Sequence, residues 1–300
     1  MNTTSFETRA YLALGAGIIA ASFATTAIRL TQNAGMDSMS LVTFRLTLIT
    51  LLMAPFALRN GRAEWAALER RDWLLAIVAG VLLAMHFIAF ISSLEYTSVI
   101  NNQTLNGTSP LFAAAAGWLI FRERLNRRIL FGIALAFAGS LLINFSTQGG
   151  NPPTREAPLL GNSLATAGAA FFALYLVLGR NVRGKMNWLP YSWMVFGLAA
   201  LTMWILNPIL QIQMLGYSRE AYLWAIAVTL LAQLITHSSF NFAVGQISPT
   251  LVSMATMVIP IGATTVALFV LDEVPGVPSI IGALIILVGV GLANLRPARD

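Results

Sequence analysis

The side chains best suited to binding a solute are polar groups that fall inside long apolar stretches. Four of them recur at intervals of four residues, Thr229, Gln233, His237 and Asn241, which places them on one face of a helix. Amides and imidazoles are costly in hydrocarbon, so this face must look inward. The stripe favours a solute-binding surface, although polar side chains in membranes also cross-link helices.

A second polar face lies between residues 97 and 121, where Asn102 and Asn106 share a helix face with Ser109. The two histidines of the chain, His86 and His237, also lie inside apolar stretches. A neutral imidazole can donate and accept a hydrogen bond, and it titrates near neutral pH. The histidines are therefore candidates for binding a substrate carboxylate or carrying protons. A hydrogen bond to a neighbouring helix is the structural alternative.

Aromatic side chains at Phe90, Phe172, Tyr175 and Phe240 can stack on an apolar solute, although aromatic residues at helical spacing also pack a core. Arg45 is the one cation inside an apolar stretch. We expect a structural role for it, snorkelling or bonding helix ends, because the second half of the chain has no equivalent. Binding of a solute carboxylate is the alternative.

Some chemistry is excluded by what the sequence lacks. There is no Cys, so disulfides and thiolate metal sites cannot form. Two separate histidines without a deep carboxylate make a poor catalytic set, so we expect no enzyme, metal or cofactor. No carboxylate is expected deep in a span, because those nearest the apolar stretches fall at the ends: Glu95, Glu123, Asp272 and Glu273. A carboxylate at mid-depth is the usual partner of a transported cation, so its absence disfavours obligate antiport of a cation.

The elements that position these residues are membrane helices. The chain has 300 residues, of which 57% are hydrophobic and 10% charged, whereas soluble proteins are about 25% charged. Apolar runs of roughly 20 residues, the length needed to cross the hydrocarbon, predict ten spans in an all-α polytopic protein. They lie near residues 10–30, 39–58, 72–94, 97–121, 128–145, 159–180, 188–211, 220–244, 247–271 and 277–296.

Positive charge indicates the orientation of these spans. If the N-terminus is cytoplasmic, most of the cations fall on the cytoplasmic side. Both termini are therefore expected there, in a multi-pass protein of the cell (inner) membrane. The basicity is interpreted as this orientation signal, so no nucleic-acid partner is expected. The cytoplasmic cations are Arg9, Arg59, Arg62, Arg70, Arg71, Arg122, Arg124, Arg127, Arg128, Arg180, Arg183, Lys185, Arg296 and Arg299.

The chain contains the same membrane segment twice. Residues 90–145 align with 240–295 at a constant offset of 150, and a linker rich in Gly and Pro, residues 146–158, separates five spans from five. Because five is odd, the halves 1–150 and 151–300 must face opposite ways. The sequence predicts two inverted five-helix repeats around a central cavity, the architecture of many secondary transporters.

Two prolines at equivalent positions mark this cavity. Pro110 and Pro260 fall near the middle of their spans, where each removes a helix hydrogen bond and frees a carbonyl four residues earlier. Free carbonyls are tolerated where neighbouring groups or a wet cavity satisfy them. We expect gating around these breaks; a simple bend for packing is the alternative.

The chain resembles the drug/metabolite transporter superfamily, in its ten-helix EamA-type branch. The resemblance rests on Pro110 followed by the residues 121–125, FRERL, on Pro260 followed by 271–275, LDEVP, and on Arg45 in the second span. It implies an exporter or exchanger of small organic metabolites, with amino acids as the nearest comparison. Proton-coupled export of drugs or other metabolites through histidine is the alternative, and an intramembrane enzyme or a non-transporting scaffold is further away.

Glycines and alanines form a stripe in the fifth and tenth spans, the pattern that permits close helix approach. A peripheral packing layer is expected there, and a homodimer through it is possible. The remaining partners are expected to be a small-molecule substrate and the lipid bilayer.

Overall fold

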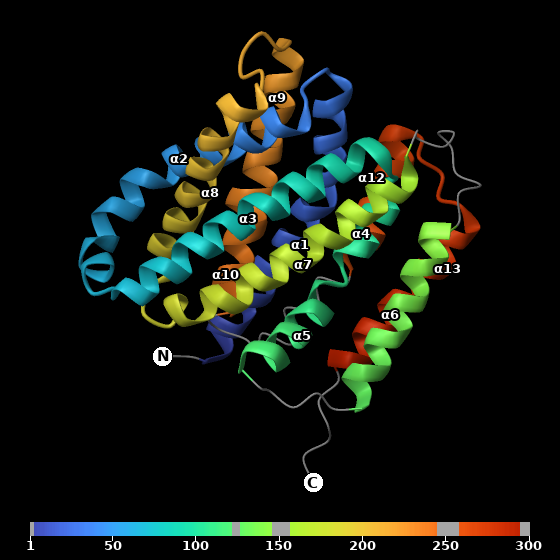
Figure 1. The fold of residues 1–300 in the computed structure, drawn as a ribbon, viewed down its shortest axis with the longest axis horizontal. Coiled ribbons are helices and arrows are strands. Elements are labelled where there is room, and N and C mark those ends of the chain that lie inside the picture. Colours follow the sequence, from blue (N-terminus) through green and yellow to red (C-terminus); the bar gives the residue numbers. More distant parts are fainter. Residues whose placement is uncertain (1–2, 122–126, 146–156, 245–257, 295–300) are drawn as a thin grey trace.

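The computed structural model describes residues 3–121, 127–145, 157–244 and 258–294, and these ranges are predominantly helical (Figure 1). The helices are α1 (Thr3–Asn33), α2 (Ser38–Ala66), α3 (Arg70–Tyr96), α4 (Val99–Asn106), α5 (Ser109–Phe121), α6 (Arg127–Phe145), α7 (Pro158–Arg183), α8 (Trp188–Leu210), α9 (Arg219–Val228), the π-helix η1 (Thr229–His237), α10 (Ser238–Val244), α12 (Ile259–Leu271) and α13 (Val277–Asn294).

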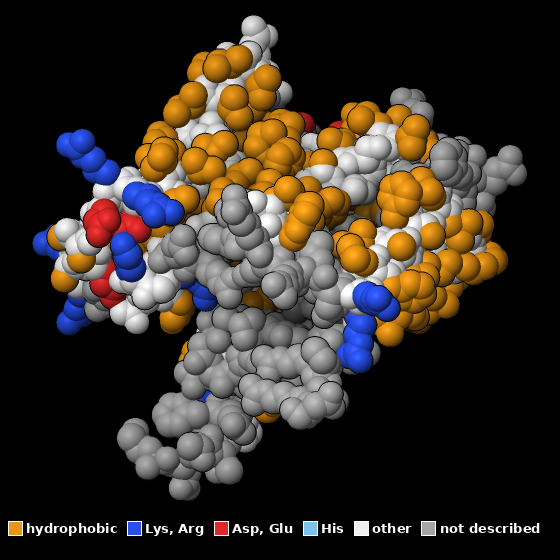
Figure 2. All heavy atoms as spheres, turned by 60° about the horizontal axis from the view of Figure 1, so that its bottom comes forward, with side chains coloured by type: hydrophobic (Ala, Val, Ile, Leu, Met, Phe, Trp, Pro, Cys, Tyr) orange, Lys and Arg blue, Asp and Glu red, His pale blue; other side chains and the backbone are white. Residues whose placement is uncertain are grey.

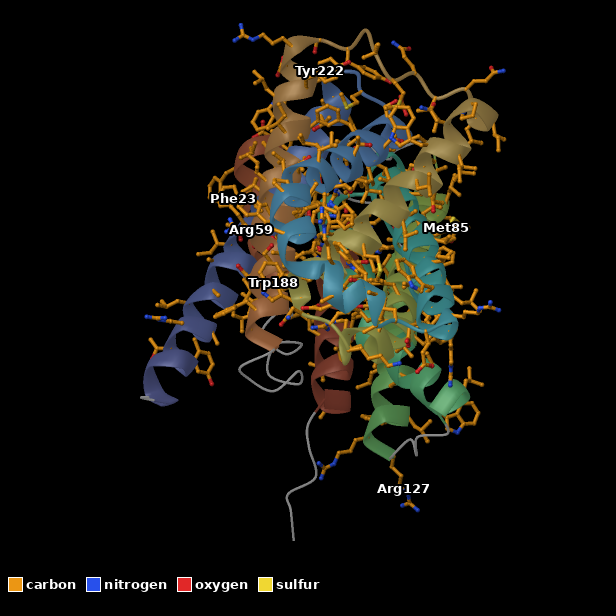
Figure 3. The ribbon with its side chains drawn as sticks, turned by 90° about the vertical axis from the view of Figure 1, so that its left-hand side faces the viewer. Phe23, Arg59, Met85, Arg127, Trp188 and Tyr222 are labelled. Carbon is orange, nitrogen blue, oxygen red and sulfur yellow. The ribbon has the colours of Figure 1, made fainter. Side chains whose placement is uncertain are left out.

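The surface of the bundle suits a membrane. Six helical segments are long and apolar enough to cross one, and three shorter apolar helical segments accompany them. Large apolar side chains are exposed on the described surface, and Phe23 and Met85 point outward on opposite sides (Figure 3). Charged side chains gather largely at one end, where the turn between α2 and α3 lies (Figure 2). The all-helical, multi-pass class is confirmed, whereas ten crossings and two cytoplasmic termini stay predictions.

The fourth expected span is broken. In place of one helix over 97–121 the chain forms α4, a turn at Gly107 and Thr108, and then α5. The Thr108 side chain donates to the carbonyl of Leu105 at 2.6 Å, which closes this turn. Pro110 is the second residue of α5, where a missing N–H costs no helix bond. Pro260 likewise stands in the first turn of α12, which follows Val258, and residues 245–257 lie outside the described part.

Helices related by the 150-residue offset pack against one another. α6 lies along α13, and α2 packs on α8. α3 packs on α7, and in the corresponding arrangement α1 packs on α9, η1 and α10. Exchanging the two halves of the sequence therefore reproduces these helix contacts.

Two glycine contacts repeat this reciprocity at atomic scale. A Cβ added to Gly139 would lie 2.7 Å from the carbonyl oxygen of Gly282, and one added to Gly289 would lie 2.7 Å from that of Gly132. Gly282 and Gly289 stand 150 positions after Gly132 and Gly139. The glycine stripe thus brings α6 and α13 together within one chain, at a distance that admits no side chain.

One end of the bundle is tied by polar contacts around Arg29 of α1. Its guanidinium donates to the carbonyls of Leu94 and of Thr97, the latter at 2.6 Å, and lies 3.4 Å from the carboxylate of Glu273. Glu273 in turn accepts from the backbone N–H of Val99 at 2.9 Å. Arg29 thus satisfies carbonyls at the end of α3, and Glu273 satisfies the start of α4.

Candidate functional site

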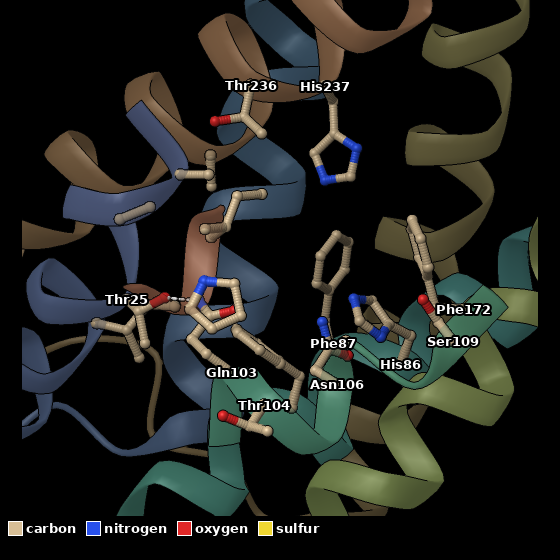
Figure 4. A pocket seen from close by; sticks show the side chains of 18 of the residues that line it. Thr25, His86, Phe87, Gln103, Thr104, Asn106, Ser109, Phe172, Thr236 and His237 are labelled. Carbon is tan, nitrogen blue, oxygen red and sulfur yellow. Dashed lines mark hydrogen bonds between the residues drawn. The ribbon is translucent and has the colours of Figure 1, made fainter. Parts of the chain in front are cut away.

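A cavity of about 190 Å³ lies among helices of both halves of the chain (Figure 4). Its walls come from α1 to α5 in the first half and from α7, η1, α10, α12 and α13 in the second. Ligand cavities for drug-sized molecules measure about 300–1,000 Å³, so this space suits a smaller solute.

His86 and Thr236 hold equivalent positions on opposite sides of this cavity. Nδ1 of His86 lies 2.9 Å from the carbonyl oxygen of Gly168 in α7. A carbonyl can only accept, so Nδ1 carries a proton, and in the neutral ring Nε2 is left as an acceptor. Thr236 stands 150 positions after His86, and its hydroxyl oxygen lies 3.2 Å from the carbonyl oxygen of Gly17 in α1. His86 thus connects α3 of the first half to α7, the first helix of the second half, and Thr236 connects η1 of the second half to α1, the first helix of the first half.

His237 contributes the second imidazole of the cavity. It is the last residue of η1, and its ring faces the edge of Phe87 at 6.2 Å and of Phe196 at 6.1 Å between centroids. Figure 4 shows His237 above Phe87 and His86 beside it. The two histidines, which the sequence offered as candidates for binding a solute, therefore line the same cavity.

Arg45 of α2 also lines the cavity. It is 1% exposed, and its guanidinium carbon lies 4.3 Å from the centroid of the Phe87 ring. Within the described residues, Nε of Arg45 is buried without an acceptor and no carboxylate lies within ion-pair distance. Snorkelling to a helix end, the expected structural role, does not describe this position.

Two amides of α4 complete the polar wall. The side chain of Gln103 donates to the hydroxyl of Thr25 in α1. The side-chain oxygen of Asn106 is buried and has no hydrogen-bond partner in the described part of the chain. Both side chains line the cavity, and Phe90, Phe240, Pro110 and Pro260 add its apolar surface.

Three of the described residues expected at the site are not among those lining this cavity. Asn102 is fully buried and donates to the carbonyl of Phe90 at 2.9 Å and to the hydroxyl of Ser93. Tyr175 is 5% exposed and packs on Phe172. The side chain of Asn241 in α10 lies outside the described part.

Gln233 is the third, and it lies in the π-helix η1. In this segment the side chain of Thr236 donates to the carbonyl of Leu231, five residues earlier, at 2.8 Å, which follows the i→i+5 spacing of a π-helix. Gln233 is fully buried and is not among the residues that line the cavity, and both polar ends of its amide lack partners among the described residues.

Sequence reasoning missed the wall that α1 provides. Ala21, Ala24, Thr25 and Ile28 line the cavity, and their spacing of three and four residues was the available signal. Thr236 could have been found from the repeat, since it stands at the offset of 150 from His86.

The comparisons with known proteins agree with this architecture. The family model described as "EamA-like transporter family" matches residues 8–145 and again 159–295. The chain belongs to the EamA-like transporter family. Membership of a transporter family implies a small-molecule substrate and a lipid bilayer around the helices.

Relatives and a solved structure extend this result. An "uncharacterized transporter" of Archaeoglobus fulgidus is 26% identical over 97% of this chain and 98% of its own length. The "uncharacterized transporter YetK" of Bacillus subtilis is 25% identical over 77% of this chain and 69% of its own length. A solved crystal structure superposes with a TM-score of 0.63 over 95% of this chain and 96% of that one, at 17% identity, which supports the fold alone.

Proposed function

We propose that this EamA-family protein is a secondary transporter that exports or exchanges small organic metabolites, most directly amino acids or related neutral or zwitterionic compounds. Residues 1–150 and 151–300 form its two inverted five-helix repeats, and rocking between them exposes the cavity to each side of the membrane in turn. Family membership favours a transporter over an enzyme.

The observation that carries this proposal is the composition of the cavity wall. His86 and Asn106 come from the first half, and Thr236 and His237 come from the second. A solute touching both sets is held by two bodies that can move relative to each other. Its binding would therefore respond to their relative motion, as alternating access requires.

The reciprocal contacts of α6 and α13 indicate where that motion would pivot. The close approach of Gly139 to Gly282 and of Gly289 to Gly132 leaves this pair little freedom to slide. The broken helix α4–α5 offers a hinge beside the cavity, since its turn at Gly107 and Thr108 makes fewer helix bonds than a continuous span.

Flux measurement tests the proposal. Liposomes that contain the purified protein are loaded with one labelled amino acid or related carboxylate at a time, and efflux and counterflow of the label are measured. At least one solute should leave the protein-containing liposomes faster than it leaves liposomes without protein. If the protein exchanges solutes, unlabelled solute outside the liposomes should accelerate this efflux. No flux above the control for any member of the panel contradicts the proposal.

Proton coupling is the second candidate, and the meeting of both histidines at one cavity favours it. An imidazole can take up and release a proton, and so it can carry one with each solute. Under this mechanism an imposed pH gradient drives solute accumulation, and His237→Gln abolishes the drive while leaving exchange intact. Equal flux with and without the gradient excludes it.

A further inference from the structure

Arg45 is a buried cation whose counter-charge the described protein does not supply. Its side chain is 1% exposed and lines the cavity. The contact it makes is with the face of Phe87, 4.3 Å from the guanidinium carbon. A cation–π contact of this kind contributes about 0.5–2 kcal/mol, whereas the effective penalty of burying an ion is several kcal/mol. The ring alone does not compensate the charge.

Nor does the sequence place an acidic residue near this depth. The stretches 38–63, 73–94 and 221–271 contain no Asp or Glu, and they include α2 around Arg45, the cavity part of α3, and the chain from α9 beyond Glu220 to the end of α12. Among the described residues lining the cavity there is no carboxylate either. An anion that balances Arg45 must therefore enter with the ligand.

The geometry of guanidinium selects the kind of anion. Its planar fork of N–H donors matches the two oxygens of a carboxylate and binds them in parallel. In the wall of the same cavity, the side-chain oxygen of Asn106 is buried without a described partner, and Nε2 of the neutral His86 ring is left as an acceptor. These neutral acceptors can each hydrogen-bond a hydroxyl or amino hydrogen of the same solute, but they carry no charge, so they do not make an amino group a requirement for binding.

The rest of the wall is apolar and aromatic. Phe87, Phe90, Phe172 and Phe240 line the cavity together with Pro110 and Pro260. Such walls bind a hydrocarbon or aromatic body by removing it from water. The volume of about 190 Å³ limits that body to a small one.

From this arrangement we infer that Arg45 binds the carboxylate of the transported solute. The solute class is small monocarboxylates with an apolar or aromatic body, and a 2-amino group is accepted without being required. This inference rests on the proposed transport function and narrows its substrate class: an amino acid is bound as a carboxylate, and its desamino analogue binds equally well.

Binding to the purified wild-type protein tests the inference without any substitution. The probes share one ring and a two-carbon chain: phenylalanine, 3-phenylpropanoate, the neutral 3-phenylpropanamide and the cationic 2-phenylethylamine. A second set on the leucine skeleton, leucine, 4-methylpentanoate, 4-methylpentanamide and 3-methylbutylamine, covers a narrower cavity. Thermal shift ranks them, because a ligand that binds the folded state raises its apparent stability.

The expected order follows from the charge on Arg45. In at least one set the amino acid and the desamino acid bind within about threefold of each other, and both bind at least roughly tenfold more tightly than the amide and the amine, about 1.4 kcal/mol by the standard conversion. Equal binding of acid and amide overturns the inference. So does binding of the amino acid without its desamino analogue, or binding of neither acid in either set.

Substitution locates the effect. Arg45→Gln should lose the preference for acid over amide, and Arg45→Lys should retain part of it, because an ammonium keeps the charge but not the bidentate fork. Arg59→Gln is the matched control, since Arg59 is an exposed arginine further along the same helix. A folded Arg45→Gln protein that still prefers the acid contradicts the assignment.

Liposome flux separates this inference from the proposed function. If wild-type protein moves the amide as fast as the acid, transport stands and the role of Arg45 falls. If the acids bind with the expected order and no solute moves, the carboxylate site stands and the transport proposal falls.

Discussion

Two arginines in adjacent helices are equally buried and differently used. Arg29 in α1 and Arg45 in α2 are each 1% exposed. Arg29 donates to the carbonyls of Leu94 and Thr97 and pairs with Glu273. Arg45 lies at the cavity wall over one aromatic ring. Burial alone therefore does not identify a functional cation; the partners that the fold provides distinguish a structural arginine from one that awaits a ligand.

The largest effect is expected at the paired arginine. Arg29→Gln leaves the carboxylate of Glu273, 6% exposed, without its counter-charge. Removing one partner of a buried pair costs about 3–5 kcal/mol, so the apparent melting temperature and the yield of folded protein in detergent should both fall sharply.

The double variant Arg29→Gln, Glu273→Gln is the control for this pair. It should be more stable than the sum of the two single changes implies, because no charge is left unpaired. A single Arg29→Gln protein as stable as wild type would show that the ion pair contributes nothing, and would remove one side of the comparison.

The opposite sign is expected at the other arginine. Arg45→Gln removes a buried charge that lacks a carboxylate among the described residues, so ligand-free stability should be unchanged or higher by up to about 2 kcal/mol. Melting without solute measures this. A loss as large as that of Arg29→Gln would mean that Arg45 is a structural residue as well.

The two halves of the chain can be compared through their equivalent glycine contacts, Gly139 in α6 and Gly289 in α13. Gly139→Ala and Gly289→Ala each place a methyl group 2.7 Å from a backbone oxygen of the facing helix. Overpacking of this kind costs about 1–3 kcal/mol, and the two variants should be destabilised alike in thermal melts.

Gly15→Ala is the matched control, since a Cβ there meets nothing within 4 Å. It should be neutral or slightly stabilising, as expected for alanine within a helix. If Gly139→Ala and Gly289→Ala differ strongly, the contact between α6 and α13 is not symmetric in energy, and the repeat is a weaker guide to the mechanism.

The smallest effect is expected at an exposed cation, Lys185. Its ammonium donates to the carboxylate of Asp72 at 2.8 Å, and this bond raises the pKa of Lys185 above its usual 10.5. A raised pKa stabilises the fold while the lysine is charged, and the contribution is lost as pH rises through that pKa.

Lys185→Gln should therefore lower the melting temperature slightly at neutral pH. The difference from wild type should vanish as the solution becomes more basic than the lysine pKa. The Lys185 side chain is 46% exposed, so water and salt screen the pair and keep its contribution small even though Asp72 is buried. A large loss at neutral pH would place Lys185 with Arg29 among the structural cations.

Much of the architecture could be predicted from local signals. Runs of about 20 apolar residues are a composition signal. A helix break near Pro110 could be predicted because proline is disfavoured inside a helix, although the break is a turn at Gly107 and Thr108, so Pro110 starts a new helix and does not free a carbonyl within a continuous one. Cavity positions for His86, Phe90, Asn106, His237 and Phe240 could be anticipated because polar or aromatic groups in apolar spans must face protein or water.

The failures trace to tertiary context. Gln233 was expected beside His237 because the two residues are four apart, but Gln233 is fully buried and does not line the cavity, so the packing around the helix decides which polar side chain reaches the space. The partners of Arg29 are 65 and more residues distant in sequence, so no pattern near either arginine distinguishes the two. The wall from α1 is mostly small apolar residues, which look like packing until a cavity is seen beside them.

The most direct test asks whether the cavity is wet and reachable from both sides of the membrane. The chain has no cysteine, so single cysteines can be placed in it without other changes. Ala24→Cys and Ala232→Cys mark the cavity wall in each half, and Ala76→Cys marks a fully buried position away from it. Each is reacted with a membrane-impermeant maleimide from one face and then the other in oriented vesicles.

Both cavity cysteines should react from either face, more slowly when 3-phenylpropanoate or 4-methylpentanoate is bound, while the cysteine at position 76 stays unreactive. Reaction from one face alone under every condition, or from neither, would contradict alternating access through this cavity.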